Sequence, residues 1–275
     1  MVKMRKKLVK NTTGGSFEAL KRVVLPQLCR GCGARGGYLC ERCKKYLCRG
    51  FRAWSVLDDG VEEREITKEE KEWKTQVSRV FRRVEFLGFR EEILGELVEG
   101  FKYDAVRGIG REIGELVFLM YFSKLSREFP EERIFLVGMP TSRKHIRGRG
   151  FDHVQVVVRR VSSLSRGKIE AARLLVRARD SVQVGASEKV RKEQAREAVR
   201  VNPAFLGEDG KVWEEIRRGK VVLLDDVWTT GASMIEAGKK LRDAGVEELF
   251  GVTITRNREG ASPTIRRGEM RDLVK

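Results

Sequence analysis

Short apolar runs bounded by charge, alternating with helical segments, constrain the fold of this chain more than any other feature. Ile134–Met139, Val221–Leu224 and Leu249–Thr255 are such runs, and fully buried parallel strands have this pattern. Phe151–Leu164 and Gly231–Ala244 lie between them and carry apolar residues at helical spacing. The alternation predicts an α/β fold with a mostly parallel sheet and flanking helices.

Charge and composition divide the chain further. Of its 57 Lys and Arg residues, 14 lie within residues 1–52, against only two acids there. Such a block attracts polyanions, nucleic acid first and an anionic membrane surface second, although a solvated tail has the same composition. The expected parts are a basic arm (1–28), a cysteine module (29–52), an acidic connector (53–75), the α/β domain (76–258) and a C-terminal tail (259–275).

Nothing in the sequence predicts a membrane span. The longest uncharged runs have nine residues, whereas a spanning helix needs about 20 apolar ones. The start of the chain is basic but lacks the apolar segment of a secretory signal. We therefore expect a cytoplasmic protein.

Four of the five cysteines form two Cys-x-x-Cys hooks, Cys29 with Cys32 and Cys40 with Cys43. Two such hooks supply the four thiolates of a closed, tetrahedral zinc site, with Zn–S distances of about 2.3 Å. The same sulfurs can hold iron, whereas a reducing cytosol disfavours disulfides. Cys48 lies outside the hooks and is expected to be a small buried residue. The Arg and Lys residues between the hooks suit a nucleic-acid contact or a peg that docks on the main domain.

The segment 220–238, KVVLLDDVWTTGASMIEAG, is the strongest chemical signal. An apolar strand ends in Asp225 and Asp226, and Thr229–Ser233 then lead into a helix. Backbone amides at a helix start, next to hydroxyls and a glycine, suit a phosphate. The two acids suit the vicinal hydroxyls of a ribose or a hydrated Mg²⁺ ion, and the alternative is a structural helix cap.

Other phosphate motifs do not fit. The chain has no GxxxxGK[ST] sequence, which excludes a Walker-type site. GIGREIG at Gly108–Gly114 has its third glycine one place late and no apolar strand before it. We interpret it as a helix face with packing glycines. Four cations within seven residues form a further candidate anion site, with an ordinary basic turn as the alternative; they are Arg143, Lys144, Arg147 and Arg149.

The motif LLDDVWTTGAS resembles the phosphoribosyl-pyrophosphate (PRPP) motif of type I phosphoribosyltransferases. From Cys29 to Arg256 the chain is similar to the ComF, or ComFC, branch of that superfamily, which is associated with DNA uptake in natural competence. The paired cysteine hooks, FKYDAVRGIGREIGELV and VGMPTSRKHIRGRGFDHVQVV carry the resemblance as well. The chain differs from that branch at GMPTS, where a Val-Pro-Val-Pro-like string is usual, and at Phe151-Asp152-His153, where Phe-Asn-Gln is usual.

The resemblance implies a set of site residues and cofactors. Asp225 and Asp226 would act as the catalytic acids and hold the ribose hydroxyls, with Mg²⁺ bound alongside PRPP and zinc in the cysteine module. Residues 178–205 would form the hood that covers the acceptor. The remaining PRPP-binding residues would be Lys102, then Thr141, Ser142 and Arg143 for pyrophosphate, and Thr229, Thr230, Gly231, Ala232 and Ser233 for the 5′-phosphate.

Two functions follow from this site. The first is a PRPP-binding competence protein that binds single-stranded DNA and works with a competence helicase or other DNA-uptake proteins. The second is a phosphoribosyltransferase that acts on an unidentified base or amine. No residue stands out as a general base, because His145 lies in the basic segment and His153 is more typical of a satisfied structural histidine.

Overall fold

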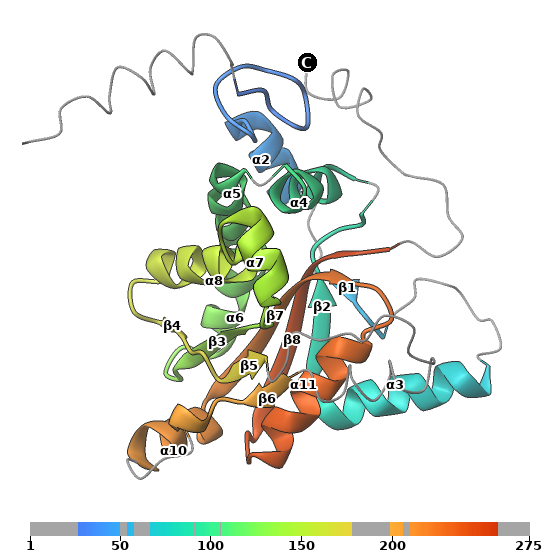
Figure 1. Ribbon diagram of the computed structural model, residues 1–275, viewed down its shortest axis with the longest axis vertical. Coiled ribbons are helices and arrows are strands. Elements are labelled where there is room, and N and C mark those ends of the chain that lie inside the picture. Colours follow the sequence, from blue (N-terminus) through green and yellow to red (C-terminus); the bar gives the residue numbers. More distant parts are fainter. Residues whose placement is uncertain are drawn as a thin grey trace, which may run out of the picture.

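The computed structural model describes residues 27–49, 54–57, 67–90, 92–104, 106–177, 199–205 and 210–257. The expected basic arm up to residue 26, residues 178–198 of the expected hood and the C-terminal tail lie outside the described residues. At the centre is a six-stranded sheet in the order β1-β2-β8-β7-β3-β4, with helices on both faces (Figure 1). No helix in the described ranges has the length and apolar character that a membrane crossing requires.

All neighbouring strands of this sheet are parallel except β1 and β2, which are antiparallel. This confirms the predicted α/β class with a mostly parallel sheet. The strands are β1 (Trp54–Ser55), β2 (Arg83–Phe86), β3 (Ile134–Gly138), β4 (Ile169–Ala171), β7 (Lys220–Trp228) and β8 (Glu248–Arg256). A separate antiparallel ladder joins β5 (Leu175–Arg177), which precedes the expected hood, to β6 (Val199–Val201), which lies in the described part of that hood, residues 199–205.

The helices form two layers. One face of the sheet carries α4 (Ile93–Lys102), α5 (Arg107–Val117), the π-helical turn η1 (Phe118–Phe122), α6 (Ser123–Glu128) and α8 (His153–Leu164). The other face carries α3 (Lys68–Val80), α10 (Gly210–Arg218) and α11 (Ala232–Asp243). The remaining helices are α2 (Glu41–Arg49), α7 (Arg143–Arg149) and the 3-10 turn η2 (Pro203–Phe205).

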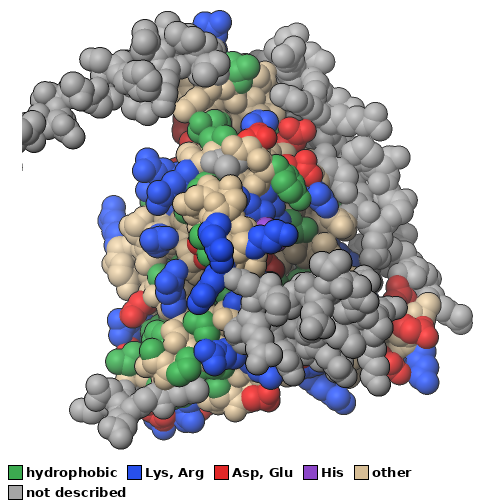
Figure 2. Space-filling model, viewed as in Figure 1, with side chains coloured by type: hydrophobic (Ala, Val, Ile, Leu, Met, Phe, Trp, Pro, Cys, Tyr) green, Lys and Arg blue, Asp and Glu red, His purple; other side chains and the backbone are tan. Residues whose placement is uncertain are grey.

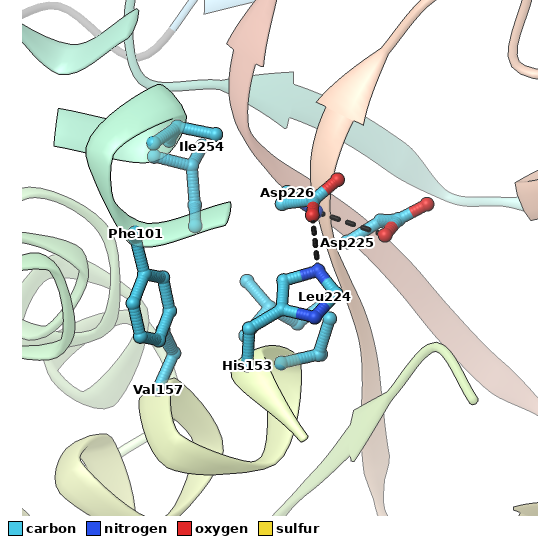
Figure 3. A pocket seen from close by; sticks show the side chains of 9 residues that line it. Phe101, His153, Val157, Leu224, Asp225, Asp226 and Ile254 are labelled. Carbon is cyan, nitrogen blue, oxygen red and sulfur yellow. Dashed lines mark hydrogen bonds and ion pairs between the residues drawn. The ribbon is translucent and has the colours of Figure 1, made fainter. Parts of the chain in front are cut away.

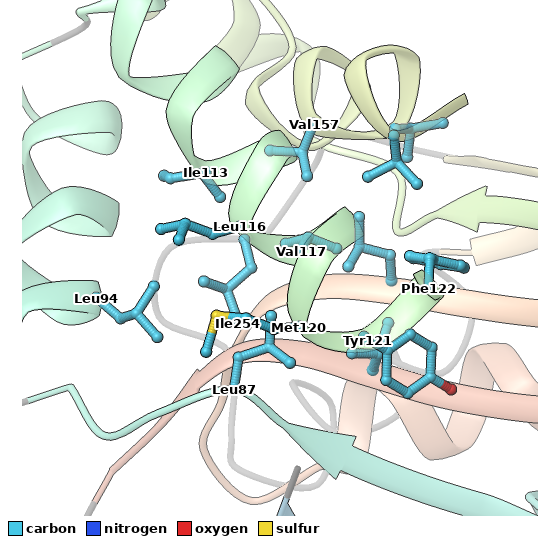
Figure 4. Close-up of a cluster of buried hydrophobic side chains, with 14 of the residues drawn as sticks. Leu87, Leu94, Ile113, Leu116, Val117, Met120, Tyr121, Phe122, Val157 and Ile254 are labelled. Atoms are coloured by element: carbon cyan, nitrogen blue, oxygen red, sulfur yellow. The ribbon is translucent and has the colours of Figure 1, made fainter. Parts of the chain in front are cut away.

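The hydrophobic core consists of two clusters, one on each face of the sheet. Figure 4 shows part of the cluster under α5, η1 and α8. Because side chains alternate along a strand, Val222 and Leu224 of β7 enter this cluster, whereas Val221 and Leu223 enter the opposite one. The same alternation sends the next two side chains, Asp225 and Asp226, to opposite faces.

One predicted boundary was wrong. The sequence predicts a strand that ends at the two acids, whereas β7 continues to Trp228, so Asp225 and Asp226 lie inside the strand. β7 pairs with β8 as far as Trp228, whereas its pairing with β3 stops at Leu224. Asp225 and Asp226 therefore lie just beyond the point where β3 ends. The helix that contains Gly108–Gly114 is α5, and it is followed directly by the π turn η1 and by α6, which continues to Glu128.

The interpretation of Gly108–Gly114 as a packing face is confirmed. Gly110 and Gly114 lie in α5 and are buried. A Cβ atom on Gly110 would come within 2.4 Å of the Phe101 ring, and one on Gly114 within 2.6 Å of Arg160 of α8. These glycines therefore let α5 approach its neighbours closely.

Candidate functional site

The two cysteine hooks meet. The thiol sulfurs of Cys29, Cys32, Cys40 and Cys43 lie within 4.8 Å of one another, and all five cysteines are free. Cys32 Sγ and Cys40 Sγ are 3.6 Å apart, close to the ~3.8 Å between ligands of a tetrahedral zinc ion. The amide of Cys40 also donates to Cys29 Sγ (3.3 Å), a contact that stabilises a thiolate. The cluster can therefore hold a metal ion, and Cys48 is outside it.

The cysteine module packs against α4 and α5, so it docks on the main domain. Cys29 and Cys43 belong to the same core cluster as those helices, and the module lies above them in Figure 1. Lys44 Nζ is buried and contacts Glu112 (3.3 Å) and Glu115 (3.1 Å) of α5. Arg30 pairs with Asp104 at 2.8 Å, and so two cations that suited a nucleic-acid contact are instead used to dock the module.

A second candidate site lies at the carboxyl ends of β3 and β7. The next strand after β3 in the chain, β4, pairs on one side of it, and β7 pairs on the other. In open α/β sheets, ligands bind in the crevice outside such a switch in strand order. The chain leaves β3 into Thr141 and Ser142 and leaves β7 into Thr229, so both predicted phosphate loops follow the two strands that pair at this switch.

The loop after β7 is shaped by Gly231. This residue has φ 74°, and a Cβ atom on it would lie 2.1 Å from the Trp228 indole. Trp73 of α3 donates its indole N–H to the Thr230 carbonyl (3.1 Å), which fixes the loop from outside. Gly231 is the N-cap residue of α11 and has no side chain that could cap the helix. Ala232 and Ser233 are exposed at the start of this helix. The loop thus presents the first turn of α11 to an anion.

The loop after β3 leads into the basic helix α7. Ser142 caps this helix by accepting from the His145 amide (3.2 Å). Arg143, Lys144 and Arg147 are exposed, and Figure 2 shows Lys and Arg side chains gathered where α7 and α8 lie. Partial burial, followed by the charges of neighbouring cations, lowers the pKa of His145 below its usual value. A segment with this excess of positive charge suits a polyanion.

Asp226 is buried and its carboxylate is already engaged. Lys102 Nζ contacts Oδ1 at 2.8 Å, and His153 Nε2 donates to Oδ2 (Figure 3). Burial alone would raise the pKa of Asp226, but the hydrogen bond from His153 and the charge of Lys102 lower it to about 2. The prediction that His153 is a satisfied histidine is confirmed, and its partner is a predicted site residue.

Asp225 has a different environment on the opposite face of β7. Its side chain is partly exposed, and its Oδ1 accepts from the Asp226 amide at 2.9 Å. Burial, followed by the negative charge of Asp226, raises the pKa of Asp225 to about 7. A carboxyl group that titrates near neutral pH beside a crevice is a candidate functional group.

Asp225→Asn is expected to stabilise the protein above pH 7. The folded carboxyl binds its proton up to about pH 7, whereas the unfolded one releases it near its ordinary value of 3.8. Asp225 therefore lowers stability as pH rises through this window, by up to about 4 kcal/mol at ~1.4 kcal/mol per pKa unit. Melting curves at pH 4.5 and pH 8 should show a clearly larger gain at pH 8, and a variant less stable than wild type at pH 8 would contradict the assignment.

Sequence reasoning missed several residues around the crevice. Trp73 lies in a stretch assigned to the connector, and Arg177, whose Nε donates to the Pro140 carbonyl (3.1 Å), lies at the end of β5. Thr141 Oγ1 donates to Asp152 Oδ1 at 3.0 Å, which ties the β3 loop to the start of α8. These contacts join segments distant in sequence, and no local pattern marks them.

Comparison with known proteins gives little support for an assignment. No family model matches the chain, and no curated protein matches its sequence. Two crystal forms of a hypoxanthine phosphoribosyltransferase from Staphylococcus aureus are among the similar solved structures. They are 15% and 13% identical, cover 58% and 60% of this chain and 68% and 70% of theirs, and have TM-scores of 0.31 and 0.30. Likeness at this level establishes neither family nor activity.

Proposed function

We propose that the crevice at the carboxyl ends of β3 and β7 binds PRPP. The observation that carries this proposal is that β3 and β7, which pair with each other, each lead into an anion-suited loop, and that the partly exposed carboxylate of Asp225 lies near the end of β7. A helix start open to a phosphate borders one side, and the basic helix α7 borders the other. PRPP combines these three features, since it has a 5′-phosphate, a ribose with free hydroxyls and a diphosphate.

In this proposal the predicted residues keep their roles, with one adjustment. Thr229, Thr230, Gly231, Ala232 and Ser233 bind the 5′-phosphate, and Thr141, Ser142 and Arg143 bind the diphosphate. Asp225 binds a ribose hydroxyl. Asp226 already accepts from Lys102 and His153, so it binds the second hydroxyl only by exchanging one of these partners. Lys102 released in this way can reach a ligand oxygen.

The chemistry at such a site is loss of diphosphate from the anomeric carbon. Mg²⁺, which prefers oxygen ligands, would be held by the diphosphate and Asp225 and would neutralise the charge of the leaving group. The cations of α7 stabilise the same charge.

Gly231→Ala is expected to weaken binding of Mg-PRPP. The new Cβ atom would meet Trp228 at 2.1 Å and force φ away from 74°, so the first-turn amides of α11 would no longer face the 5′-phosphate. Each lost hydrogen bond to a charged group costs about 1.5–3 kcal/mol, so affinity should fall by about tenfold or more. Isothermal titration calorimetry measures this directly.

Gly167→Ala is the matched control for this experiment. Gly167 also has a positive φ, 89°, but a Cβ atom on it would meet nothing within 4 Å. It lies in the turn between α8 and β4, before the amino end of β4, whereas the proposed site lies at the carboxyl ends of the parallel strands. Both substitutions place an alanine at a backbone position with positive φ, but only Gly231→Ala should lower the affinity for PRPP. Equal affinity in the two variants, or no PRPP binding by wild type, would refute the proposal.

A role in DNA uptake through single-stranded DNA binding stays a prediction. In the cysteine module, Arg30 and Lys44 are engaged by acids of the main domain. Lys45 is exposed, so reversing its charge tests DNA binding by the module better than reversing the charge of Lys44 does. If the module binds DNA, the dependence of affinity on salt should flatten in that variant.

A further inference from the structure

Trp73 joins α3 to the loop that follows β7. Its indole Nε1 donates to the carbonyl of Thr230 at 3.1 Å, across 157 positions of the chain. Its ring also packs edge-to-face against Trp228, the last residue of β7, with 6.1 Å between the ring centroids. Trp228 is buried and Trp73 is partly buried in the core on this face of the sheet. The hydrogen bond to Thr230 therefore comes from a side chain that packing holds in place.

The position of Trp73 is set by the packing of its helix. α3 begins at a capping box formed by Thr67 and Glu70 and lies beside α11 (Figure 1). A Cβ atom on Gly238 of α11 would come within 2.5 Å of Val80 and 2.7 Å of Phe81. Because the two helices approach each other so closely, α3 has little freedom to slide along α11. The indole of Trp73 is thus presented to the loop at a fixed position.

The hydrogen bond determines which way the peptide between Thr230 and Gly231 faces. This peptide is trans, so its carbonyl oxygen and its amide hydrogen point in opposite directions. Since Trp73 binds the oxygen on the side of α3, the Gly231 N–H points away from α3. Gly231 has φ 74° and ψ −4°, and reversal of the peptide would bring φ to about −90°, as in a type I turn. Glycine adopts both conformations, so Gly231 by itself does not fix the orientation.

The Gly231 amide has no acceptor in the part of the chain that the structure describes. Gly231 is buried, and buried backbone amides are almost always paired. The next amide, that of Ala232, reaches the Thr230 hydroxyl at 3.4 Å, which is long for a hydrogen bond. An anion at the start of α11 can supply the acceptor that Gly231 lacks.

We propose that Trp73 is a positioning residue for phosphate binding by the loop after β7. By holding the Thr230 carbonyl toward α3, its indole turns the Gly231 amide toward the phosphate. Without this donor the peptide can reverse, and a carbonyl oxygen, which repels a phosphate, then takes the place of the amide. This inference rests on the proposed function for the identity of the anion, the 5′-phosphate of PRPP.

The two hydrogen bonds of this peptide should reinforce each other. A donor at the carbonyl oxygen polarises the peptide and strengthens the hydrogen bond that the amide makes, and the converse also holds. Coupling between two contacts is reciprocal, so a phosphate bound at Gly231 should strengthen the hydrogen bond of Trp73 by the same free energy. Ligand binding can therefore be followed at the Trp73 indole in the unaltered protein.

Indole NMR on the full chain measures this coupling, with ribose 5-phosphate as the probe. The chain has four tryptophans, and the indole signal of Trp73 is the one that is absent in Trp73→Phe. Saturating ribose 5-phosphate should slow the exchange of this N–H with solvent and shift its signal downfield, as a stronger hydrogen bond does. The same exchange rate and shift in the free and bound protein would overturn the inference.

Calorimetry provides the second readout. Trp73→Phe keeps an aromatic ring near Trp228 but has no N–H to donate. Its affinity for ribose 5-phosphate should fall about two- to tenfold, the contribution of one neutral hydrogen bond. A purely structural role for Trp73 would lower the melting temperature of this variant and leave its affinity as in wild type, which would also overturn the inference.

Trp213→Phe is the matched control for both readouts. Trp213 is a partly buried indole that packs against the same core cluster as Trp73. It lies in α10, which directly precedes β7, and so it is near the amino end of the strand whose carboxyl end leads into the loop. Its indole signal should not respond to ribose 5-phosphate, and Trp213→Phe should bind the probe as wild type does.

The outcomes distinguish this inference from the proposed function. If wild type binds neither Mg-PRPP nor ribose 5-phosphate, the proposed function is refuted. Equal affinities of wild type and Trp73→Phe would overturn the inference and leave PRPP binding intact. Should Trp73→Phe fail to fold, indole exchange in wild type with and without ligand decides the question, with the Trp73 signal identified through variants of the other tryptophans.

Discussion

Cys43→Ser should cost the protein its metal and much of its stability. Cys43 is fully buried in the core that the cysteine module has in common with α4 and α5, so loss of the metal site disrupts that core as well. Structural zinc contributes about 10–16 kcal/mol of apparent binding free energy in zinc-finger peptides. At about 2–4 °C per kcal/mol in a domain of this size, the melting temperature should fall by at least about 10 °C.

Cys48→Ser is the matched control. Cys48 lies in the same helix, α2, but outside the cluster of four sulfurs. It should retain one zinc ion per chain by elemental analysis and melt close to wild type. The zinc assignment would be wrong if the native protein contained no metal, if it contained iron instead, or if Cys43→Ser kept its zinc.

Asp226→Asn is expected to lower the free energy of unfolding by about 3 kcal/mol. It leaves the Lys102 ammonium without its carboxylate, and breaking a buried ion pair typically costs about 3–5 kcal/mol. The lower end applies because 17% of the Lys102 side chain and 12% of the Asp226 side chain remain exposed. Urea unfolding at pH 7 measures the loss.

A double variant shows whether the ion pair is the cause. Adding Lys102→Met to Asp226→Asn removes the uncompensated charge, so the double variant should be more stable than Asp226→Asn alone. The neighbouring Asp225→Asn should shift stability in the opposite direction at pH 8. If Asp226→Asn lowered the free energy of unfolding by less than about 1 kcal/mol, the Lys102–Asp226 pair would contribute no more than an exposed salt bridge does.

The sequence predicted the layers of the fold better than the limits of its elements. Apolar runs at Ile134–Met139 and Leu249–Thr255 mark buried strands because both faces of a parallel sheet are covered. The apolar part of β7 was found for the same reason. Its continuation through Asp225 to Trp228 was missed, because pairing with β8 rather than local hydropathy keeps that segment extended.

The candidate site was predicted in composition but not in its internal contacts. The acids lie near the end of β7, the loop around Gly231 follows that strand, and α7 follows β3, the strand that pairs with β7, so the topology directs these segments to the same end of the sheet. Treating Asp225 and Asp226 as an equivalent pair overlooked the alternation of side chains, which was available from the sequence. The engagement of Asp226 by Lys102 and His153 was not available, because it joins three elements far apart in the chain.

The short strand β1 has a practical consequence for preparing the protein. Trp54 and Ser55 cover the outer edge of β2, the Val56 amide donates to the Val84 carbonyl (2.9 Å), and the Val56 side chain is fully buried. A shortened chain that starts near residue 76 would leave the backbone groups of β2 unpaired and open to strand addition by another molecule. Such a fragment should aggregate, so an expression boundary belongs before Trp54.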